Sequence, residues 1–242
     1  MLREIGRIVA LYQYPVKSMA GRRLDSAQLG WHGLVGDRRC AFKRTGVTSG
    51  FPWLTAGRLP HLIRYTPVWQ SPGESGELPT HVRTPAGKEL ELDSEELRLE
   101  VSQAFGSPVE LMRLDQGIFD EADVSLITTS TIAAIEQQAE LQLDAARFRP
   151  NILVETPGLP PFAEDAWIGK ALQIGNEAAV HVYLPDVRCA MINLDPENGA
   201  ANSAVLKAVV KLNANNAGVY GSVLKTGTLA VGDQLFLSEL AR

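Results

Sequence analysis

The chain has 242 residues, 45% hydrophobic and 21% charged, which is typical of a soluble globular protein with one large domain or two small ones. Its net charge of −5 argues against general nucleic-acid binding but leaves a local basic pocket open. We expect no membrane segment and no signal peptide, because no long apolar run is present, and two distant cysteines indicate a reducing cytoplasm.

The N-terminal residues predict a strand followed by a loop. Residues 5–12 alternate in the manner of a half-buried strand. Pro15 ends a central strand and Gly21 marks a turn, so both Lys17 and Ser18 should lie on a loop or at a strand edge. A solvated lysine is the simpler interpretation of Lys17, and the alternative is a cation presented beside a hydroxyl.

A Gly-rich turn within 33–43 leads into the next strand and carries an acid–base pair. Asp37 could pair with Arg38 or Arg39 at the surface, where an ion pair contributes little stability. Alternatively, one of the arginines faces inward and binds an anion with its planar guanidinium. Cys40 falls within the strand pattern, so we expect it in the core. We further expect strands over 27–31, 62–68 and 109–114, and two short strands within 82–92 on either side of a turn at 85–87. An ordered loop is expected over 46–60, and an exposed, linker-like loop over 71–79.

One helix is predicted before residue 106. Ser94 is a suitable N-cap, and acidic residues follow it in the first turn. Apolar residues then recur every four positions up to Phe105, which predicts one buried helical face. Gly106 ends the helix, because glycine readily adopts the left-handed conformation of a C-terminal cap.

Two arginines precede a strongly apolar strand over 152–155. Pro150 biases Arg149 toward an extended conformation, which places Arg147 and Arg149 on the same face of the chain. Two guanidinium groups on one face repel each other unless carboxylates or an anion lie between them. A salt-bridge network and an anion site are both consistent with this segment.

The remaining pattern predicts a barrel-like β architecture with a few covering helices, because short strands alternate with Gly-rich turns. We expect strands over 124–128, 171–174, 180–184, 219–224, 227–233 and 234–237, and helices after 129–131 and over 201–212. The acidic stretch 115–123 separates this region from the first. We therefore predict two domains, 1–115 and 120–242.

Cys189 lies in a short segment, 185–199, which turn-forming residues open and close. We expect Pro185 and Asp186 to start the turn. The neighbouring Arg188 favours the thiolate over the thiol, and a thiolate is a soft metal ligand or a nucleophile. The alternative is a small buried hydrophobic residue. No local signature supports a cysteine–histidine hydrolase.

Four stretches together resemble the MOSC family, named for the C-terminal domain of molybdenum-cofactor sulfurase. They are Tyr14-Pro-Val-Lys-Ser, Gly36-Asp-Arg, Arg147-Phe-Arg-Pro-Asn, and Arg188-Cys with Asp195-Pro. The chain is similar in kind to bacterial stand-alone MOSC proteins and to the mitochondrial amidoxime-reducing component. The resemblance implies a mainly β (α+β) fold, with an N-terminal β-barrel domain over 1–115 and a MOSC domain over 120–242.

The resemblance also implies the molybdenum cofactor, in which a pyranopterin with a terminal phosphate holds molybdenum through a dithiolene. Cys189 matches the cysteine that ligates the metal, where catalysis would occur. The positions that match residues holding the pterin and phosphate are Lys17, Ser18, Arg38, Arg149 and Asn151. Arg147 and Arg188 are neighbouring candidates for the same basic pocket.

One stretch departs from the family pattern. The family usually has Thr-Ala-Arg or Thr-Gln-Arg where this chain has Thr55-Ala-Gly-Arg58. Gly57 therefore occupies the usual position of the arginine. Either the loop shifts to deliver Arg58, or one anchor for the cofactor is missing.

By resemblance, the protein is a molybdenum-dependent oxidoreductase that reduces N-hydroxylated or N-oxygenated small molecules. The chain has no flavin, haem or iron–sulfur motif, so an external electron donor is implied, either ferredoxin-like or a flavin reductase. Two alternatives share the same residues: a carrier of the cofactor without turnover, and a sulfur carrier that uses a persulfide on Cys189. We expect neither nucleic-acid nor membrane partners.

Overall fold

A computed structural model describes residues 2–48, 50–70, 78–117 and 121–239 of the chain. Seven strands close into a barrel in the order β11-β10-β14-β13-β12-β16-β1, and β1 pairs with β11 to complete the ring. All pairs in the ring are antiparallel except β10 with β11. The strands are β1 (Arg3–Gln13), β10 (Val124–Thr128), β11 (Ile152–Glu155), β12 (Lys170–Ile174), β13 (Ala178–Val187), β14 (Asn216–Lys225) and β16 (Gln234–Glu239). The mainly β prediction is confirmed.

The first strand, β1, pairs with two strands that lie far from it in the sequence. β1 pairs with β11, where Arg7 lies opposite Glu155, and with β16, where Arg3 lies opposite Leu237. A strand from the N-terminal region thereby lies within a barrel built otherwise from residues 124–239. The division into 1–115 and 120–242 stays a prediction.

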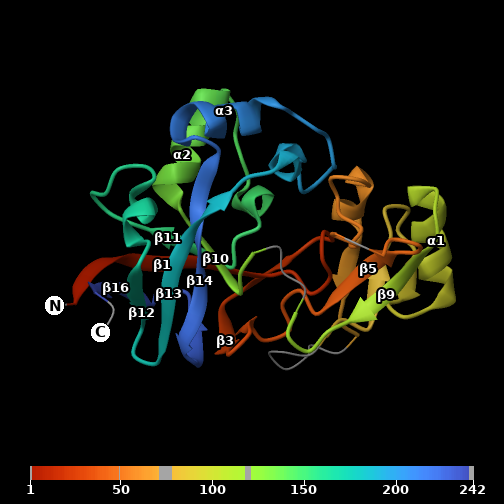
Figure 1. Cartoon of the computed structure of the whole chain (residues 1–242), viewed down its shortest axis with the longest axis horizontal. Helices are drawn as coiled ribbons and strands as arrows, with labels where there is room; N and C mark the ends of the chain where they lie inside the picture. Colours follow the sequence, from red (N-terminus) through yellow and green to blue (C-terminus); the bar gives the residue numbers. More distant parts are fainter. Residues whose placement is uncertain (1, 49, 71–77, 118–120, 240–242) are drawn as a thin grey trace.

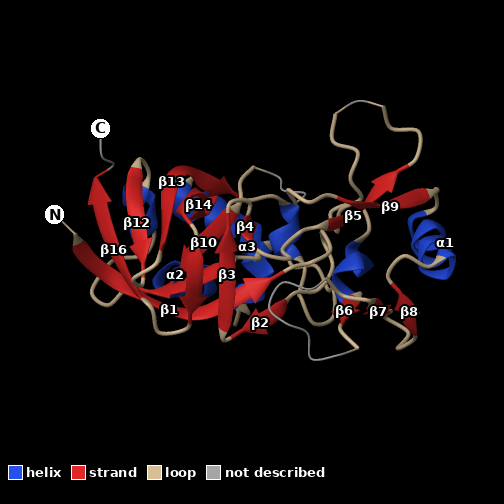
Figure 2. Ribbon diagram, turned by 90° about the horizontal axis from the view of Figure 1, so that it is seen from below, coloured by secondary structure: helices blue, strands red, loops and turns tan. Residues whose placement is uncertain are grey.

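A smaller part of the molecule lies beside the barrel (Figure 1, Figure 2). It contains the pair β5 and β9, the sheet β6-β7-β8 and helix α1. A third small sheet, β15-β3-β4, and strand β2 extend from the barrel. These elements are β2 (Arg22–Leu24), β3 (Ser26–Gly30), β4 (Gly33–Leu34), β5 (Cys40–Arg44), β6 (Thr66–Val68), β7 (His81–Arg83), β8 (Glu89–Glu91), β9 (Val109–Arg113), β15 (Gly227–Ala230) and α1 (Glu95–Phe105).

The helix signals predicted for α1 are confirmed, whereas α2 begins at Thr129, within the stretch 129–131 that was predicted to precede it. Ser94 caps α1 by accepting a hydrogen bond from Leu97 N, and Gly106 ends it in a left-handed conformation. Thr128 caps α2 by accepting from Thr131 N. Helices α2 and α3 lie side by side on the outer face of the barrel (Figure 1). Besides α2 (Thr129–Ala139) and α3 (Ala204–Asn213), the structure has short 3₁₀ helices η1 (Pro60–Arg64), η2 (Ala145–Phe148), η3 (Ala163–Trp167) and η4 (Ala190–Asn193).

The predicted strand over 62–68 is half wrong. Its first residues form η1, which Pro60 begins, and only Thr66–Val68 is a strand. Proline favours the first turn of a helix because its fixed backbone angle suits that position. Most of the predicted linker 71–79 lies outside the described residues. No helix among those described is long and apolar enough to span a membrane.

Two main apolar cores hold these parts together. One fills the barrel and includes Trp167, which is almost fully buried. The other lies beneath α1 and includes Cys40, as predicted from its place in the strand pattern. A third cluster lies between the barrel and the pair α2 and α3. The site described below lies where these parts meet.

A substitution at Gly6 probes how closely β1 packs against β11 where the barrel closes. A Cβ atom at Gly6 would lie 2.1 Å from the carbonyl oxygen of Glu155, so Gly6→Ala must displace β1 from β11. We expect a loss of about 1–3 kcal/mol in the free energy of unfolding, the usual cost of overpacking. Urea unfolding measures it, with Gly57→Ala as control because its nearest neighbour would lie at 3.6 Å. Equal stability of both variants would contradict tight closure.

Candidate functional site

A cavity of about 380 Å³ lies between residues of the barrel and the loops that enter the smaller part. Seven of the eight residues predicted to form a site line this cavity: Lys17, Ser18, Arg38, Arg147, Arg149, Arg188 and Cys189. They come from segments that are far apart in the sequence. The fold therefore brings the predicted residues together, and Asn151 is the exception.

The Cys189 thiol is exposed at this cavity, whereas Cys40 is buried in the core. Cys189 lies just beyond the end of β13 and immediately before η4. Our prediction that Pro185 starts the turn is wrong, since β13 continues to Val187. Register shifts on both sides of Pro185 accommodate a residue that has no N–H for the ladder.

Three of the lining residues have a left-handed backbone. The φ angles are 65° at Ser18, 47° at Arg38 and 51° at Arg149. This conformation is unfavourable for residues other than glycine, and it persists only where the surrounding structure enforces it. Such residues concentrate at functional sites, so their convergence on one cavity is evidence for a site.

The extended conformation predicted for Arg149 is therefore wrong. Residues 145–148 form η2, and Arg149 caps it through a hydrogen bond from its N–H to Ala146 O. The Arg149 Nη1 atom donates to Met19 O at 2.7 Å, and its guanidinium lies 4.1 Å from the Tyr14 ring centroid. These contacts hold the left-handed turn against the preference imposed by Pro150.

Arg147 reaches the cavity from the same turn but has a carboxylate partner. Its Nη2 atom lies 2.9 Å from Asp195 Oδ2, and its Nη1 atom donates to Asn193 O at 3.0 Å. Burial lowers the pKa of Arg147, and the Asp195 carboxylate opposes that shift. The salt-bridge interpretation therefore holds for Arg147, which anchors the segment after Cys189.

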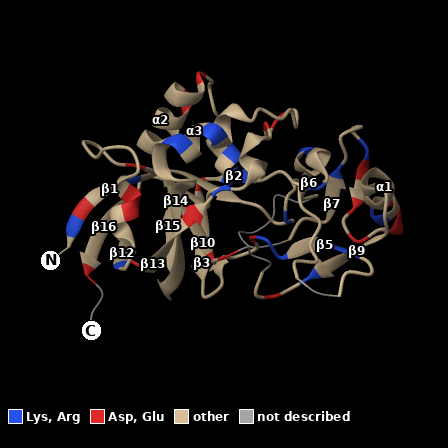
Figure 3. Cartoon of the chain, turned by 45° about the horizontal axis from the view of Figure 1, so that its top comes forward, with Lys and Arg blue, Asp and Glu red and all other residues tan. Residues whose placement is uncertain are grey.

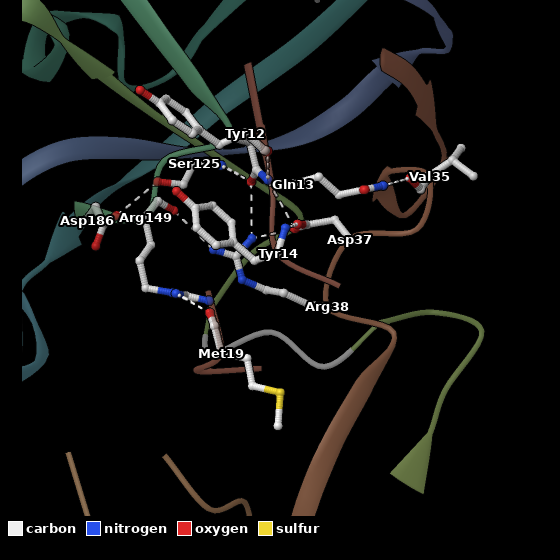
Figure 4. Close-up of polar contacts among 11 residues, drawn as sticks. Tyr12, Gln13, Tyr14, Met19, Val35, Asp37, Arg38, Ser125, Arg149 and Asp186 are labelled. Carbon is white, nitrogen blue, oxygen red and sulfur yellow. Dashed lines mark hydrogen bonds and ion pairs between the residues drawn. The ribbon is translucent and has the colours of Figure 1, made fainter. Parts of the chain in front are cut away.

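Arg38 is the inward-facing arginine that the sequence left open (Figure 4). Its guanidinium forms an ion pair with Asp37, and its Nη2 atom donates to Arg149 O at 3.1 Å. Asp37 is fully buried and also accepts from Tyr14 N at 2.6 Å. The Asp37 carboxylate raises the pKa of Arg38 against the opposing effect of burial. The pair is thus a buried anchor and not a surface contact.

Asn151 lies behind the cavity wall and does not line it. Its Nδ2 atom donates to Asp37 Oδ2 at 3.0 Å and to Tyr12 O at 3.3 Å. Its Oδ1 atom accepts from Ser125 N at 3.1 Å. Because its amide bonds protein groups on both sides, the geometry favours a supporting role for Asn151 beside Arg38.

Most of the hydrogen-bonding groups of the Arg188 guanidinium contact other protein atoms. Its guanidinium donates to Phe148 O at 2.7 Å and to Ala217 O through two nitrogens, with Nε at 2.7 Å. Its Nη2 atom lies 2.8 Å from Asp186 Oδ2. The guanidinium thus ties β14 to the turn before Arg149, so its contribution to the cavity is chiefly positional.

Sequence reasoning missed Asp186 and Tyr220, which both line the cavity. The Asp186 side chain is buried and accepts from Ser125 Oγ at 3.1 Å and from the Tyr220 hydroxyl. Burial raises the pKa of Asp186 to about 6, although Arg188 lowers it. The two-residue spacing of Asp186 and Arg188 was the available signal, because in an extended chain it places both side chains on one face.

Lys17 and Ser18 are buried at the cavity wall, so the solvated interpretation of Lys17 is wrong. The Lys17 N–H donates to Cys40 O at 2.8 Å, and its Nζ atom lies 5.3 Å from the Phe51 ring centroid. The loop thus presents a cation and a hydroxyl together, as the alternative interpretation required.

The turn over 55–58 decides whether Arg58 replaces the arginine that the family has at the position of Gly57. Gly57 lines the cavity, whereas Arg58 is exposed and does not. The Arg58 N–H donates to Thr55 O at 2.9 Å, which fixes this turn. The loop therefore does not deliver Arg58, and the position that the family fills with arginine has no side chain.

Gly57→Arg is expected to add a cation to the cavity wall. A Cβ atom there meets only Thr55 Oγ1, at 3.6 Å, so the backbone admits a side chain. We expect inorganic phosphate to bind about tenfold more tightly, the effect of one hydrogen bond to a charged group. Titration calorimetry measures this, with Arg58→Ala as control. Weaker phosphate binding in Arg58→Ala would contradict the assignment.

The lining residues fit an anionic ligand with a soft metal centre. Five cationic side chains and two carboxyl groups line the cavity, although the chain as a whole is acidic. Figure 3 shows acidic and basic residues intermixed elsewhere on the chain. Among the described residues, no group of three or more His, Cys, Asp or Glu side chains could hold a metal ion. Cys189 supplies a thiol, which is a soft metal ligand, at the cavity.

Comparison with known proteins finds matches to two family models and to named relatives. The MOSC domain model matches residues 112–236, and that of the MOSC N-terminal beta barrel domain matches residues 5–144. Mitochondrial amidoxime-reducing component 1 of Homo sapiens is 25% identical over 290 aligned positions, which cover 98% of this chain and 84% of the human protein. Mitochondrial amidoxime reducing component 2 of Bos taurus is 29% identical over 130 positions, which cover 48% of this chain and 37% of the bovine protein.

A solved structure supports the fold. The YuaD protein from Bacillus subtilis superposes with a TM-score of 0.54 at 13% identity, and the match covers 100% of both chains. At this identity the likeness shows the fold alone. Each of the two family models covers more than half of the chain. The chain therefore belongs to the MOSC family.

Proposed function

We propose that this protein binds the molybdenum cofactor and reduces N-hydroxylated or N-oxygenated small molecules. The observation that carries the proposal is the exposed Cys189 thiol, which shares one cavity with Lys17, Arg38 and Arg149. A soft thiolate beside several cations suits a metal held by an anionic pterin. The names of the human and bovine relatives supply the reaction class.

The residues have distinct roles in this proposal. Cys189 would ligate molybdenum, and the bound cofactor would supply two-electron oxygen-atom transfer. Lys17, Ser18 and Arg149 would hold the pterin and its phosphate. Arg38 would do the same, held by the buried Asp37. The apolar side chains of Phe51 and Val187, both exposed at the cavity, would exclude water from the reacting group.

The proposal includes an external electron donor, either a ferredoxin-like protein or a flavin reductase. Each turnover needs two electrons, and the resemblance provides for no second redox group on this chain. Both cysteines are free, which fits a reducing compartment such as the cytoplasm. We propose no nucleic-acid or membrane partner.

The test is elemental molybdenum and pterin content of protein expressed with molybdate, followed by turnover of an amidoxime with chemical reductant. Near-stoichiometric metal and amidine formation would support the proposal. Loaded protein that reduces no amidoxime or hydroxylamine would overturn the catalytic part and favour a cofactor carrier. Absence of metal, with sulfide released from Cys189 by mild thiol, would favour a sulfur carrier.

A further inference from the structure

Three neighbouring strands of the barrel place hydroxyl and carboxyl groups together at the cavity. Ser125 on β10 lies directly opposite Tyr220 on β14, and Asp186 lies on β13, the next strand. Asp186 accepts hydrogen bonds from both hydroxyls. Both Tyr220 and Asp186 line the cavity, where Tyr220 is half-buried and Asp186 is almost wholly buried. A chain of exchangeable protons thus leads from the cavity into the barrel.

Two arginines and two hydroxyl groups, from different segments of the chain, act on the Asp186 carboxyl group. Arg188, from the end of its own strand, and Arg38, from the turn after β4, both lower its pKa, as do the hydroxyls of Ser125 and Tyr220. Burial outweighs all four and leaves the pKa at about 6. The carboxyl group therefore changes its protonation state close to neutral pH, although it forms an ion pair with Arg188.

We propose that Tyr220 donates a proton to the oxygen that the substrate loses, and that Asp186 returns a proton to Tyr220. This inference rests on the proposed function and assigns the source of one proton. Lys17 and Glu121 also line the cavity and could carry a proton. Lys17 lies against the Phe51 ring, and Glu121 is exposed. Tyr220 is hydrogen-bonded to the buried Asp186, which is a second proton carrier.

The step balances for a hydroxylamine or an amidoxime. The N–O bond breaks, two electrons come from the external donor, and two protons are taken up, so the products are R–NH₂ and water. One proton passes from the Tyr220 phenol to the departing oxygen. The Asp186 carboxyl group then reprotonates the phenolate and recovers a proton from solvent, while the second proton comes from solvent directly. Tyr220 would be catalytic, and Asp186 would act through it as a positioning and relay residue.

The test compares Tyr220→Phe, Asp186→Asn and the wild type after metal loading, with chemical reductant and an amidoxime. We expect Tyr220→Phe to lower kcat about a hundredfold, the usual contribution of a general acid, with molybdenum and pterin content unchanged. The wild-type kcat should fall as pH rises through about 6, because Asp186 then loses its proton. Asp186→Asn should be slower and should lose this pH dependence.

Unfolding of the metal-free protein gives a second readout that does not require activity. The folded pKa of Asp186 is raised, so its stabilising contribution is present below the unfolded value of 3.8 and is lost as pH rises through about 6. Urea unfolding should therefore show wild-type stability falling relative to Asp186→Asn across this window. The unfolding constant should change by a factor of the order of a hundred.

Glu164→Gln is the matched control. Glu164 is also a buried carboxyl group with a raised pKa and hydroxyl partners, Thr128 and Thr131, but it does not line the cavity. The kcat of Glu164→Gln should depend on pH in the same way as the wild-type kcat. If the wild type turns over but Tyr220→Phe keeps full kcat, or Asp186→Asn keeps the pH profile, the relay is wrong. If the loaded wild type is inactive, the proposed function fails and the relay with it.

Discussion

Replacing Cys189 by serine is expected to reduce bound molybdenum at least tenfold and to abolish amidoxime reduction. The thiolate is a soft ligand, whereas a serine hydroxyl is hard and stays protonated at neutral pH. The fold should survive, because Cys189 is exposed. Elemental analysis and pterin fluorescence, measured on wild type and variant expressed together with molybdate, report the loss.

Cys40→Ala provides the matched control for Cys189. Both residues are free thiols, but Cys40 is buried beneath α1 and does not line the cavity. Cys40→Ala should lower stability modestly, through the small cavity it leaves, and should keep its metal. Undiminished molybdenum in Cys189→Ser would show that the thiolate is not a ligand. The remaining proposal would then be anion binding alone.

Asp37→Ala should cost about 3–5 kcal/mol in the free energy of unfolding, the range for breaking a buried ion pair. The substitution leaves Arg38 without its carboxylate and the Tyr14 N–H without its acceptor. It also removes the partner of the Asn151 amide. We expect weakened phosphate binding as well, because Asp37 holds Arg38 at the cavity. Urea unfolding and calorimetry measure the two effects.

A surface ion pair serves as the comparison for Asp37. Asp93 lies 3.3 Å from Arg113, and both side chains are more than half exposed. Asp93→Ala should therefore cost no more than about 1 kcal/mol. If Asp37→Ala proves equally mild, the Asp37–Arg38 pair is not the anchor that its burial indicates, and Arg38 must be positioned by other contacts.

Local signals in the sequence predicted those elements whose causes are local. The cap at Ser94 and the glycine at position 106 define α1 correctly, because both act within one helical turn. The alternation over 5–12 lies within β1, and the strand pattern around Cys40 places it in the core. Five cationic, hydroxyl and thiol positions matched to the family, together with the neighbouring candidates Arg147 and Arg188, do meet at one cavity.

Predictions failed where distant contacts override local preference. Pro150 disfavours a left-handed Arg149, yet hydrogen bonds and the Tyr14 ring from another segment hold it there. Pro185 was expected to start a turn, but bulges in the pairing of β13 with β14 accommodate it within the strand. Neither the bulges nor the stacking partner has a local sequence signature.

The sequence by itself determined the mainly β class, the caps of α1 and the family to which the chain belongs, since these depend on residue type and short-range order. Only the tertiary structure decided that β1 closes the barrel and that Gly57 lines the cavity. It alone brought Asp186 beside Tyr220 from separate strands. The physical reason is that burial and partners set the chemistry of a side chain, and both come from residues distant in the sequence.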